Sequence, residues 1–287
     1  MERRDVRGLL QAGLRRFRGG REEGHAPGDR QARVVAIAAR KGGVGKTTTA
    51  VNLAAALVEA GQSVFLADLD PQGHVASALR EVARPGPVPL SEVLLADRPR
   101  DVLDAAIESG LPGLWLTAPD KGLGDAESRL TGRVGRETIL QAAMATARTR
   151  YDTILLDCPP MLGNLTLNAL LAADAVLVPC DMSILALEGV ADLLDLVVTV
   201  RERLRHPLDV LGVLRTRVDG RNKSLNDEVG QALADNFGDL LLDTVIPVNS
   251  ALAAAQSAGQ SIFAFRPRSA GADAYRALAA EMGRRLG

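Results

Sequence analysis

The chain has 287 residues, a formal net charge of −1 and 47% hydrophobic residues, with aromatic residues at only 3%. This length suits one large α/β domain, and the near-neutral charge argues against a generally basic nucleic-acid binder. No apolar run approaches the roughly 18 residues of a membrane span, so we expect a cytoplasmic globular protein with a core of Ala, Val, Leu and Ile.

The first 32 residues are predicted to form a basic extension ahead of a main domain at residues 33–287. Apolar residues recur at helical spacing between Val6 and Phe17 among several arginines, and Gly19-Gly20 ends the pattern before a polar tether. A basic amphipathic helix of this kind can lie on an anionic membrane, dock on a partner or contact DNA. It can equally pack within a dimer of the chain or lack fixed structure, so several roles stay open.

A glycine-rich loop joins a predicted buried strand at 34–39 to a predicted helix at 45–60. Its sequence, which holds two of the chain's four lysines, is Arg40-Lys41-Gly42-Gly43-Val44-Gly45-Lys46-Thr47-Thr48. A lysine ammonium is a compact charge that can enter a cage of backbone amides, whereas the planar guanidinium of arginine needs a wider approach. The glycines let backbone N–H groups face an anion, and the helix N-terminus adds partial positive charge. This context predicts a phosphate site in which Lys46 reaches the β- and γ-phosphates and Thr47 binds Mg²⁺.

Carboxylates follow two further strands, which are predicted from apolar runs at 63–68 and 153–157. Asp68 and Asp70 close the first of these strands, and Asp157 closes the second. The carboxyl ends of parallel strands face the ligand crevice of an open α/β sheet. We therefore expect Asp70 and Asp157 beside the phosphate loop, and Asp68 in a structural role.

The other elements are predicted from apolar runs and helical spacing. The strands are expected at 114–117, 175–179, 209–215 and 241–246, and the helices at 73–80, 137–148, 164–172, 184–204, 224–236, 249–257 and 271–285. The segment Pro85-Gly-Pro-Val-Pro89 is typical of an exposed loop. Cys158 and Cys180 lie at the ends of apolar strands, so we expect small buried side chains in a reducing compartment.

The glycine loop departs from the general phosphate-loop pattern because Arg40 replaces its first glycine. The sequence Lys41-Gly-Gly-Val-Gly-Lys46-Thr-Thr resembles the deviant Walker A motif of the ParA/MinD family of ATPases. The segments Asp68–Gly73, Pro159–Leu170 and Ala186–Val190 are similar to the ParA/Soj branch of that family. The resemblance covers roughly residues 33 to 287. It implies an α/β fold with a mostly parallel, doubly wound sheet, helices on both faces, and slow Mg²⁺-dependent hydrolysis of ATP.

The same resemblance implies roles for individual residues. Lys41 would reach across a dimer interface to the other subunit's nucleotide, and Asp70 would help to hold Mg²⁺ and position the attacking water. Asp157 would accept from the Mg²⁺ shell, while Pro247 and Asn249 would contact the adenine opposite Thr216 and Arg217. The implied catalytic residues are Lys41, Lys46 and Asp70, and the implied metal-site residues are Thr47, Asp70 and Asp157. The implied ATP contacts are Lys41, Gly42, Gly43, Val44, Gly45, Lys46, Thr47, Thr48, Pro71, Asp157, Thr216, Arg217, Pro247 and Asn249.

Basic residues concentrate between positions 201 and 223, a stretch that contains seven Arg and Lys residues and three acidic residues. Such a run is either a solvated protein face or a patch that binds the DNA backbone once dimerisation doubles it. The resemblance favours DNA, because ParA proteins bind duplexes without sequence preference near this part of the chain. It makes Arg201, Arg221 and Lys223 the expected DNA contacts.

The resemblance as a whole implies an ATP-dependent homodimer that binds non-specific double-stranded DNA on the nucleoid and responds to a ParB-like or other cargo adaptor. Two alternatives belong to other classes: a MinD-like membrane switch that uses the N-terminal helix, and a metabolic P-loop enzyme acting on a small acid. An iron-sulfur cluster held by the two cysteines is a further alternative, which their placement does not favour. Ser183-Ile184-Leu185 departs from the branch, which usually has an acidic residue and two tyrosines there, so the surface at these residues is expected to differ.

Overall fold

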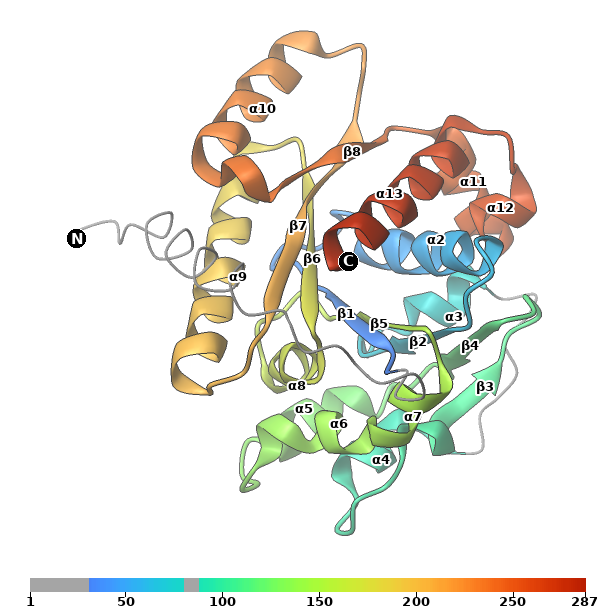
Figure 1. The fold of residues 1–287 in the computed structure, drawn as a ribbon, viewed down its shortest axis with the longest axis vertical. Helices are drawn as coiled ribbons and strands as arrows, with labels where there is room; N and C mark the ends of the chain where they lie inside the picture. The colour runs from blue at the N-terminus through green and yellow to red at the C-terminus, as the bar shows by residue number, and fades with distance from the viewer. Residues whose placement is uncertain (1–30, 80–87) are drawn as a thin grey trace.

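The computed structural model describes residues 31–79 and 88–287. The predicted N-terminal extension lies almost entirely outside these residues, and so does most of the loop predicted at Pro85–Pro89. Within the described residues the strands form one eight-stranded sheet in the order β3-β4-β2-β5-β1-β6-β7-β8 (Figure 1). The strands are β1 Arg33–Ile37, β2 Val64–Asp68, β3 Ala106–Glu108, β4 Leu114–Thr117, β5 Thr153–Asp157, β6 Ala175–Asp181, β7 Asp209–Val218 and β8 Leu241–Pro247.

The sheet is parallel except for the short pairing of β3 with β4, so the predicted fold class is confirmed. Successive side chains of its central strands enter two different cores: Val34 and Ala36 of β1 face one, and Val35 and Ile37 face the other. Because both faces are covered, the central strands are apolar throughout, which is why short apolar runs predicted them.

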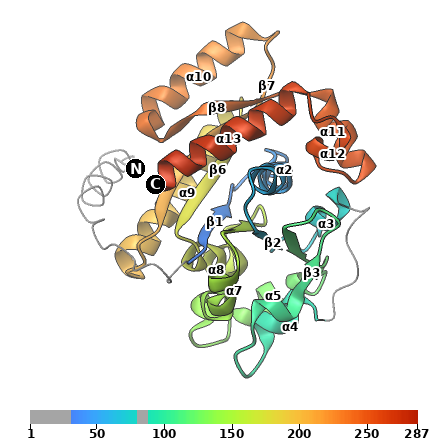
Figure 2. The ribbon, with the colours of Figure 1, turned by 45° about the vertical axis from the view of Figure 1, so that its right-hand side comes forward.

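Helices cover both faces of the sheet. One face carries α2 Lys46–Glu59, α3 His74–Ala78, α11 Ser250–Ala258, α12 Ile262–Phe265 and α13 Ala270–Leu286, with α13 lying along α2 (Figure 2). The other carries α4 Leu90–Leu95, α5 Leu123–Leu130, α6 Ile139–Ala143, α7 Ala145–Arg150, α8 Asn164–Ala172, α9 Ile184–Arg203 and α10 Lys223–Phe237. Three 3₁₀ turns complete the described elements: η1 Val102–Ala105, η2 Arg136–Thr138 and η3 Gly238–Leu240.

One predicted helix is wrong, and some short elements were missed. The helix expected at 137–148 is divided into η2, α6 and α7, because the backbone leaves helical geometry at Thr138 (φ −112°, ψ 6°) and again at the buried Met144 (φ −90°, ψ 0°). The elements β3, α4, α5 and α12 had not been predicted. Each has eight residues or fewer, which is too short for a clear periodic signal.

The strand order creates a crevice between the carboxyl ends of β1 and β5. The connection from β1 to β2 passes β5, whereas the connection from β5 to β6 passes β1 in the opposite direction. Helices leaving in opposite directions open a gap above the strand ends, which is where ligands bind in open α/β sheets. The glycine loop and Asp157 follow these two strands and therefore border this crevice.

At the far side of the sheet, a buried glutamate of α13 stabilises an irregular part of β8. The register between β7 and β8 shifts after Val213, and Glu281, which is 2% exposed, accepts hydrogen bonds from the freed amides of Asp243 (2.8 Å) and Thr244 (2.9 Å). Burial acts to raise the pKa of Glu281, but these hydrogen bonds and the nearby Arg285 outweigh it and lower the pKa below the ordinary value of 4.5.

Replacing Glu281 by Gln should destabilise the fold by about 2 kcal/mol at neutral pH, because one strong charged acceptor is lost and one amide remains unpaired. A lowered folded-state pKa stabilises the fold above the ordinary pKa of 4.5, and this stabilisation is lost as the pH falls through the lowered value. The gap between the parent and Glu281→Gln should therefore narrow in acid, which urea unfolding at neutral pH and at about pH 4 would measure. A gap that is the same at both pH values would contradict this role of the charge.

Candidate active site

The glycine loop leaves β1 and enters α2 with its backbone turned around an open space. Gly43 and Gly45 have φ angles of +77° and +91°, in the left-handed region that favours glycine. A Cβ atom built at either position would meet nothing within 4 Å, so glycine is needed there for its conformation and not for lack of room. The loop thus presents its backbone to a cradle at the N-terminus of a 14-residue helix.

Lys46, the first residue of α2, lies inside this cradle with only 7% of its surface exposed. Its Nζ donates a hydrogen bond to the carbonyl of Lys41 at 3.2 Å. Burial lowers the pKa of Lys46, and the charges of Asp157 and Asp70 act in the opposite direction. The sequence prediction that these residues come together around the loop therefore agrees with the structure.

Asp157, the last residue of β5, is completely buried. Neither of its carboxylate oxygens has a hydrogen-bond partner of normal geometry among the described residues. Burial, followed by the charge of Asp68, raises the pKa of Asp157 well above its ordinary value, while the Thr47 hydroxyl and Lys46 act to lower it. A buried carboxylate with so few donors is suited to a cation or to water bound to a cation.

Asp68 stands beside Asp157 because the parallel register of β2 and β5 pairs the two residues. Its oxygens accept hydrogen bonds from the amides of Asp70 (3.0 Å) and Val75 (3.1 Å), which shape the turn after β2. Burial raises the pKa of Asp68 to about 7 despite these bonds. These contacts agree with the structural role expected for Asp68.

Asp70 lies in the turn that Asp68 organises and is 7% exposed. It accepts a hydrogen bond from the amide of Gln72 at 3.0 Å. The Thr47 hydroxyl and the carboxylates of Asp70 and Asp157 form an oxygen donor set of the kind that Mg²⁺ prefers. No group of three or more His, Cys, Asp or Glu side chains within the described ranges could hold a metal by itself, but Mg²⁺ commonly uses one or two carboxylates together with phosphates. These residues fit Mg²⁺, which would neutralise charge that develops on the phosphates.

The carboxyl end of β7 holds the glycine loop from the side. The Thr216 hydroxyl donates to the carbonyl of Val44 at 2.8 Å, and Arg217 Nη1 donates to the carbonyl of Gly43 at 3.1 Å. Arg217 has a φ of +53°, an uncommon value for a residue with a side chain. Thr216 and Arg217 were predicted to contact the adenine; the structure gives both a contact with the loop, and the adenine contact stays a prediction.

Lys41 points to a different place from Lys46. Its Nζ donates to both oxygens of Asp181, at 2.8 and 3.1 Å, and to the hydroxyl of Ser183 at 3.0 Å. Asp181 ends β6 and had not been singled out, although a carboxylate at a strand end is the signal that identified Asp157. A neighbouring ion pair between Arg40 and Asp192 also holds the loop to α9.

The last two predicted adenine contacts, Pro247 and Asn249, lie at and just after the end of β8. Pro247 ends β8, and the side chain of Asn249 accepts a hydrogen bond from the amide of Ala251 at 2.8 Å to cap α11. Asn52, which had not been predicted, donates to the carbonyl of Thr48 and accepts from the amide of Ile262, both at 2.8 Å. It therefore joins the loop helix to the chain that follows Asn249, while the adenine role of Pro247 and Asn249 stays a prediction.

The two cysteines are buried, as expected. Burial raises the pKa of the Cys158 thiol above its ordinary range and that of Cys180 to about 12. Buried thiols with raised pKa values are neutral near pH 7 and pack as small apolar groups. Both side chains therefore act as small core residues in the described conformation.

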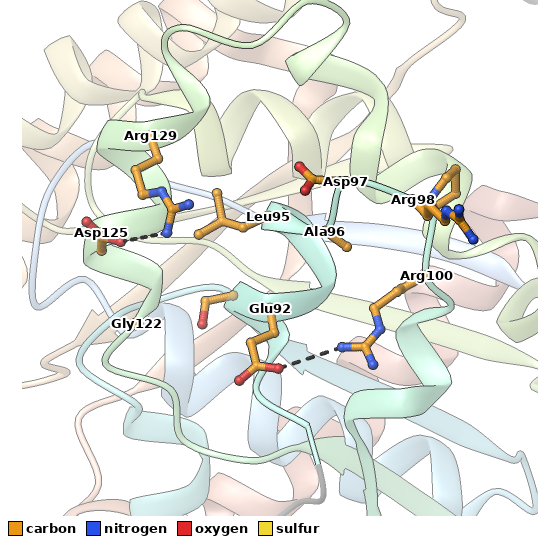
Figure 3. Close-up of a pocket in the computed structure, with 11 residues that line it drawn as sticks. Glu92, Leu95, Ala96, Asp97, Arg98, Arg100, Gly122, Asp125 and Arg129 are labelled. Atoms are coloured by element: carbon orange, nitrogen blue, oxygen red, sulfur yellow. Dashed lines mark hydrogen bonds and ion pairs between the residues drawn. The ribbon is translucent and has the colours of Figure 1, made fainter.

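A separate cavity of about 490 Å³ lies on the outer side of α4 and α5 (Figure 3). Four of its charged side chains form ion pairs within the lining, Glu92 with Arg100 at 3.7 Å and Asp125 with Arg129 at 3.4 Å. None of its lining residues comes from the glycine loop or from the strand ends above. It is therefore distinct from the phosphate site.

Within the described ranges, no helix has both the length and the apolar character needed to cross a membrane.

A buried lysine in a glycine loop, facing a strand-end carboxylate across the crevice of a parallel sheet, defines a P-loop nucleoside triphosphatase. The AAA domain family model matches residues 32–210. The chain is 40% identical to the chromosome partitioning protein ParA of Caulobacter vibrioides, over 87% of this chain and 93% of the relative. It is 43% identical to the chromosome-partitioning ATPase Soj of Thermus thermophilus, over 87% and 95% of the two chains. The crystal structure of cobyrinic acid a,c-diamide synthase from Mycobacterium smegmatis with bound ADP and magnesium matches with a TM-score of 0.75 and 36% identity, over 89% and 95% of the chains.

The chain therefore belongs to the ParA/MinD family of P-loop ATPases, within its ParA/Soj branch. Family membership confirms the predicted fold and the predicted enzyme class, a Mg²⁺-dependent ATPase. The family had been identified from the loop and the strand-end motifs, which are the same residues that the structure brings together.

Replacing Thr216 by Val should weaken ATP binding about fivefold, because the loss of one hydrogen bond of about 1 kcal/mol leaves the Val44 carbonyl without this donor. Titration with a fluorescent ATP analogue would measure the change. Thr199→Val is the matched control, because the Thr199 hydroxyl donates a similar bond to the backbone carbonyl of Asp195 at 3.0 Å within α9. ATP affinity equal to that of the parent in Thr216→Val would show that the β7 contact does not shape the loop.

Proposed function

We propose that the chain is a ParA-type positioning ATPase. Two ATP-bound copies form a sandwich dimer, and the dimer binds duplex DNA without sequence preference. A ParB-like or other cargo adaptor stimulates ATP hydrolysis, which releases the protein from the DNA. Repeated cycles move or space a cargo along the nucleoid in the cytoplasm. The names of the ParA and Soj relatives support a partition role, and the residues around the loop support its individual steps.

The different environments of the two loop lysines carry the dimer proposal. Lys46 is buried beside Asp157 and Asp70, inside the cradle of its own loop. Lys41 is 35% exposed and bonds to Asp181 and Ser183, at the edge of the loop. A single phosphate chain needs one lysine in its cradle, and the second is placed at a surface from which it can reach another molecule's nucleotide. The buried position of Lys46 and the partly exposed position of Lys41 support a nucleotide that is shared between two copies.

The DNA proposal rests on Arg221 and Lys223, at the connection between β7 and α10. Both side chains are exposed. Arg221 is 86% exposed and pairs with both oxygens of Asp219, at 2.8 and 2.9 Å, which holds the pKa of Asp219 at about 2. This exposed pair can open toward a DNA phosphate at little cost, because surface ion pairs contribute little to stability.

Arg201 does not fit the DNA role predicted for it. Its side chain is 9% exposed, its Nε donates to the carbonyl of Leu208, and its guanidinium faces Asp209. The basic run is also divided by β7: Arg203 and Arg205 precede this ten-residue strand and Arg221 follows it, so the two ends are about 30 Å apart. We therefore assign the DNA surface to Arg221 and Lys223 and leave Arg201 out.

Two other functions remain as outcomes of the tests. The likeness to the cobyrinic acid a,c-diamide synthase structure favours a metabolic enzyme, in which ATP would activate an acid. A membrane role would require the N-terminal helix predicted within residues 1–32, which lies outside the described residues.

Replacing Lys41 by Ala should leave ATP affinity within about twofold of the parent but abolish ATP-dependent dimerisation, because the loop cradle keeps Lys46. Lys46→Ala is the contrasting variant and should lose nucleotide binding itself. Light scattering with and without ATP would report dimerisation, and nucleotide titration would report binding. A Lys41→Ala variant that dimerises as readily as the parent would refute the shared-nucleotide proposal.

Replacing Arg221 and Lys223 together by Glu should weaken ATP-dependent binding to all duplex sequences alike, because both side chains would contact phosphates. Binding by the parent should fall with salt at a log-log slope of about −0.9 per phosphate neutralised. The matched control is Arg203→Glu with Arg205→Glu, at the other end of β7, which should bind as the parent does. Electrophoretic shifts at two salt concentrations would measure these affinities.

Co-sedimentation of the parent protein with duplex DNA or with anionic liposomes, each with and without ATP, separates the alternative functions. Parent protein that sediments with liposomes and ignores DNA would support the membrane alternative. Parent protein that binds neither, and whose ATP hydrolysis requires a small carboxylic acid, would support the metabolic alternative. DNA binding that does not depend on ATP would contradict the proposed cycle.

A further inference from the structure

Helix α5 and the residues that flank it lie beside two chain segments, each of which adjoins an acidic residue of the active site at the crevice. The first segment, residues 70–73, contains Asp70 and follows β2. The second, residues 158–163, follows Asp157 and leads into α8. These two segments are far apart in sequence, yet both contact residues between positions 119 and 131. α5 lies next to α8 in the fold (Figure 1).

The side chain of Glu127 holds the start of α8, where the second segment ends. Its two carboxylate oxygens accept hydrogen bonds from the amides of Asn164 at 2.6 Å and Leu165 at 2.9 Å. These are the first two residues of α8, whose N-cap, Gly163, has no side chain to do this. A Cβ at position 163 would overlap the Glu127 carboxylate, so glycine leaves the space that the carboxylate occupies. Glu127 therefore acts as the cap of α8 from another helix.

The backbone around Glu127 strengthens this attachment. Asn164 Nδ2 donates to the carbonyl of Glu127 at 3.0 Å and to the hydroxyl of Thr131 at 3.1 Å. The start of α8 is thus bound to α5 through both a side chain and the main chain. Because Asp157 is fixed by the sheet and Asn164 by α5, the six residues between them are held at both ends.

The contact with the first segment is made by the chain that enters α5. A Cβ built at Gly73 would lie 3.1 Å from Cβ of Pro119, and one built at Gly124 would lie 3.9 Å from Cβ of Pro71. Asp120 fixes this entry, because its oxygens accept from the amides of Ser91 (2.6 Å) and Gly122 (2.8 Å). The turn that carries Asp70 therefore packs against the start of the same helix that caps α8.

We propose that Glu127 is a positioning residue for ATP hydrolysis: by capping α8 from α5, it sets the 158–163 segment relative to the 70–73 segment. The hydrogen bonds of Glu127 described above are made with Asn164 and Leu165, and not with the glycine loop. The effect of Glu127 is therefore on the geometry of the reacting phosphate end and not on the binding of ATP. This inference rests on the family's ATPase reaction and is independent of DNA binding.

The test is ATP hydrolysis by full-length Glu127→Ala and Glu127→Gln. Glu127→Ala removes both acceptors, and Glu127→Gln keeps one acceptor while its NH₂ faces the second amide. We expect kcat to fall on the order of tenfold for Ala and about threefold for Gln, with KM within about twofold of the parent, because small displacements of reacting groups reduce rate more than binding. Amide hydrogen exchange at Asn164 and Leu165 should accelerate in the same order.

Glu281 supplies a matched structural control, because it also accepts from two consecutive backbone amides, at 2.8 and 2.9 Å, but at β8. Glu281→Gln and Glu281→Ala should lower the melting temperature as much as the Glu127 variants do, yet keep the parent's kcat per folded molecule. Rates are measured well below the melting temperature of each variant. If Glu127→Ala does not fold, Glu127→Gln alone decides the outcome.

Three results would overturn the proposal. The first is a parent-like kcat in the Glu127 variants together with a lower melting temperature, which would make the contact purely structural. The second is an equal loss of kcat in the Glu127 and Glu281 variants, which would trace the effect to general destabilisation. A fall in ATP affinity without a change in kcat would also contradict it, because the proposal places the effect on the reaction.

Discussion

Burial of the Asp157 carboxylate is the electrostatic constraint on which the nucleotide end of this protein depends. A carboxylate removed from water without donors is unfavourable, and the register of the sheet adds a second buried carboxylate, Asp68, beside it. The sheet cannot relieve this, since both residues lie at the ends of central strands. Burial raises the pKa of both carboxyl groups, and positive charge on the loop side, from Lys46 and the start of α2, favours the ionised form of Asp157. Mg²⁺ bound to phosphates would add further positive charge at this place. Binding of the nucleotide would therefore also stabilise the buried carboxylates at the strand ends.

The glycine loop keeps its position beside these carboxylates because neighbouring elements bind its outer edge. Thr216 and Arg217 bind its carbonyls from β7, while Arg40 and Lys41 bind acidic residues of α9 and β6. With its outer edge bound, the loop keeps its amides turned inward, and the free energy of ordering it is provided during folding and not during nucleotide binding. Contacts beyond the loop, such as the cap that α5 gives to α8, fix the chain where the segment after Asp157 ends.

Much of this arrangement could be predicted because the residues that form it lie close together in the sequence. A strand, a glycine loop and a helix follow one another within about 25 residues, and the strand-end carboxylates need only an apolar run before them. Other features depend on contacts distant in sequence. Arg201 is buried because the returning chain brings the carbonyl of Leu208 and the carboxylate of Asp209 to it. Helix α5 has its apolar residues at Leu123, Ala126 and Leu130, but its eight residues include a glycine, and tertiary packing decides that it forms. Met144 interrupts a segment whose spacing is helical throughout, which periodicity alone does not reveal.

The two edges of the sheet, among the described residues, are poor templates for another strand. β3 has three residues and runs against its neighbour, while β8 bears the irregular stretch whose amides Glu281 occupies. Short edges and bulges are the devices by which β-proteins avoid growing by edge-to-edge pairing. Lateral extension of the sheet into fibres or aggregates is thereby discouraged on both sides. On the β8 side this protection depends on the carboxylate of Glu281, which keeps two amides of the edge strand paired within the chain.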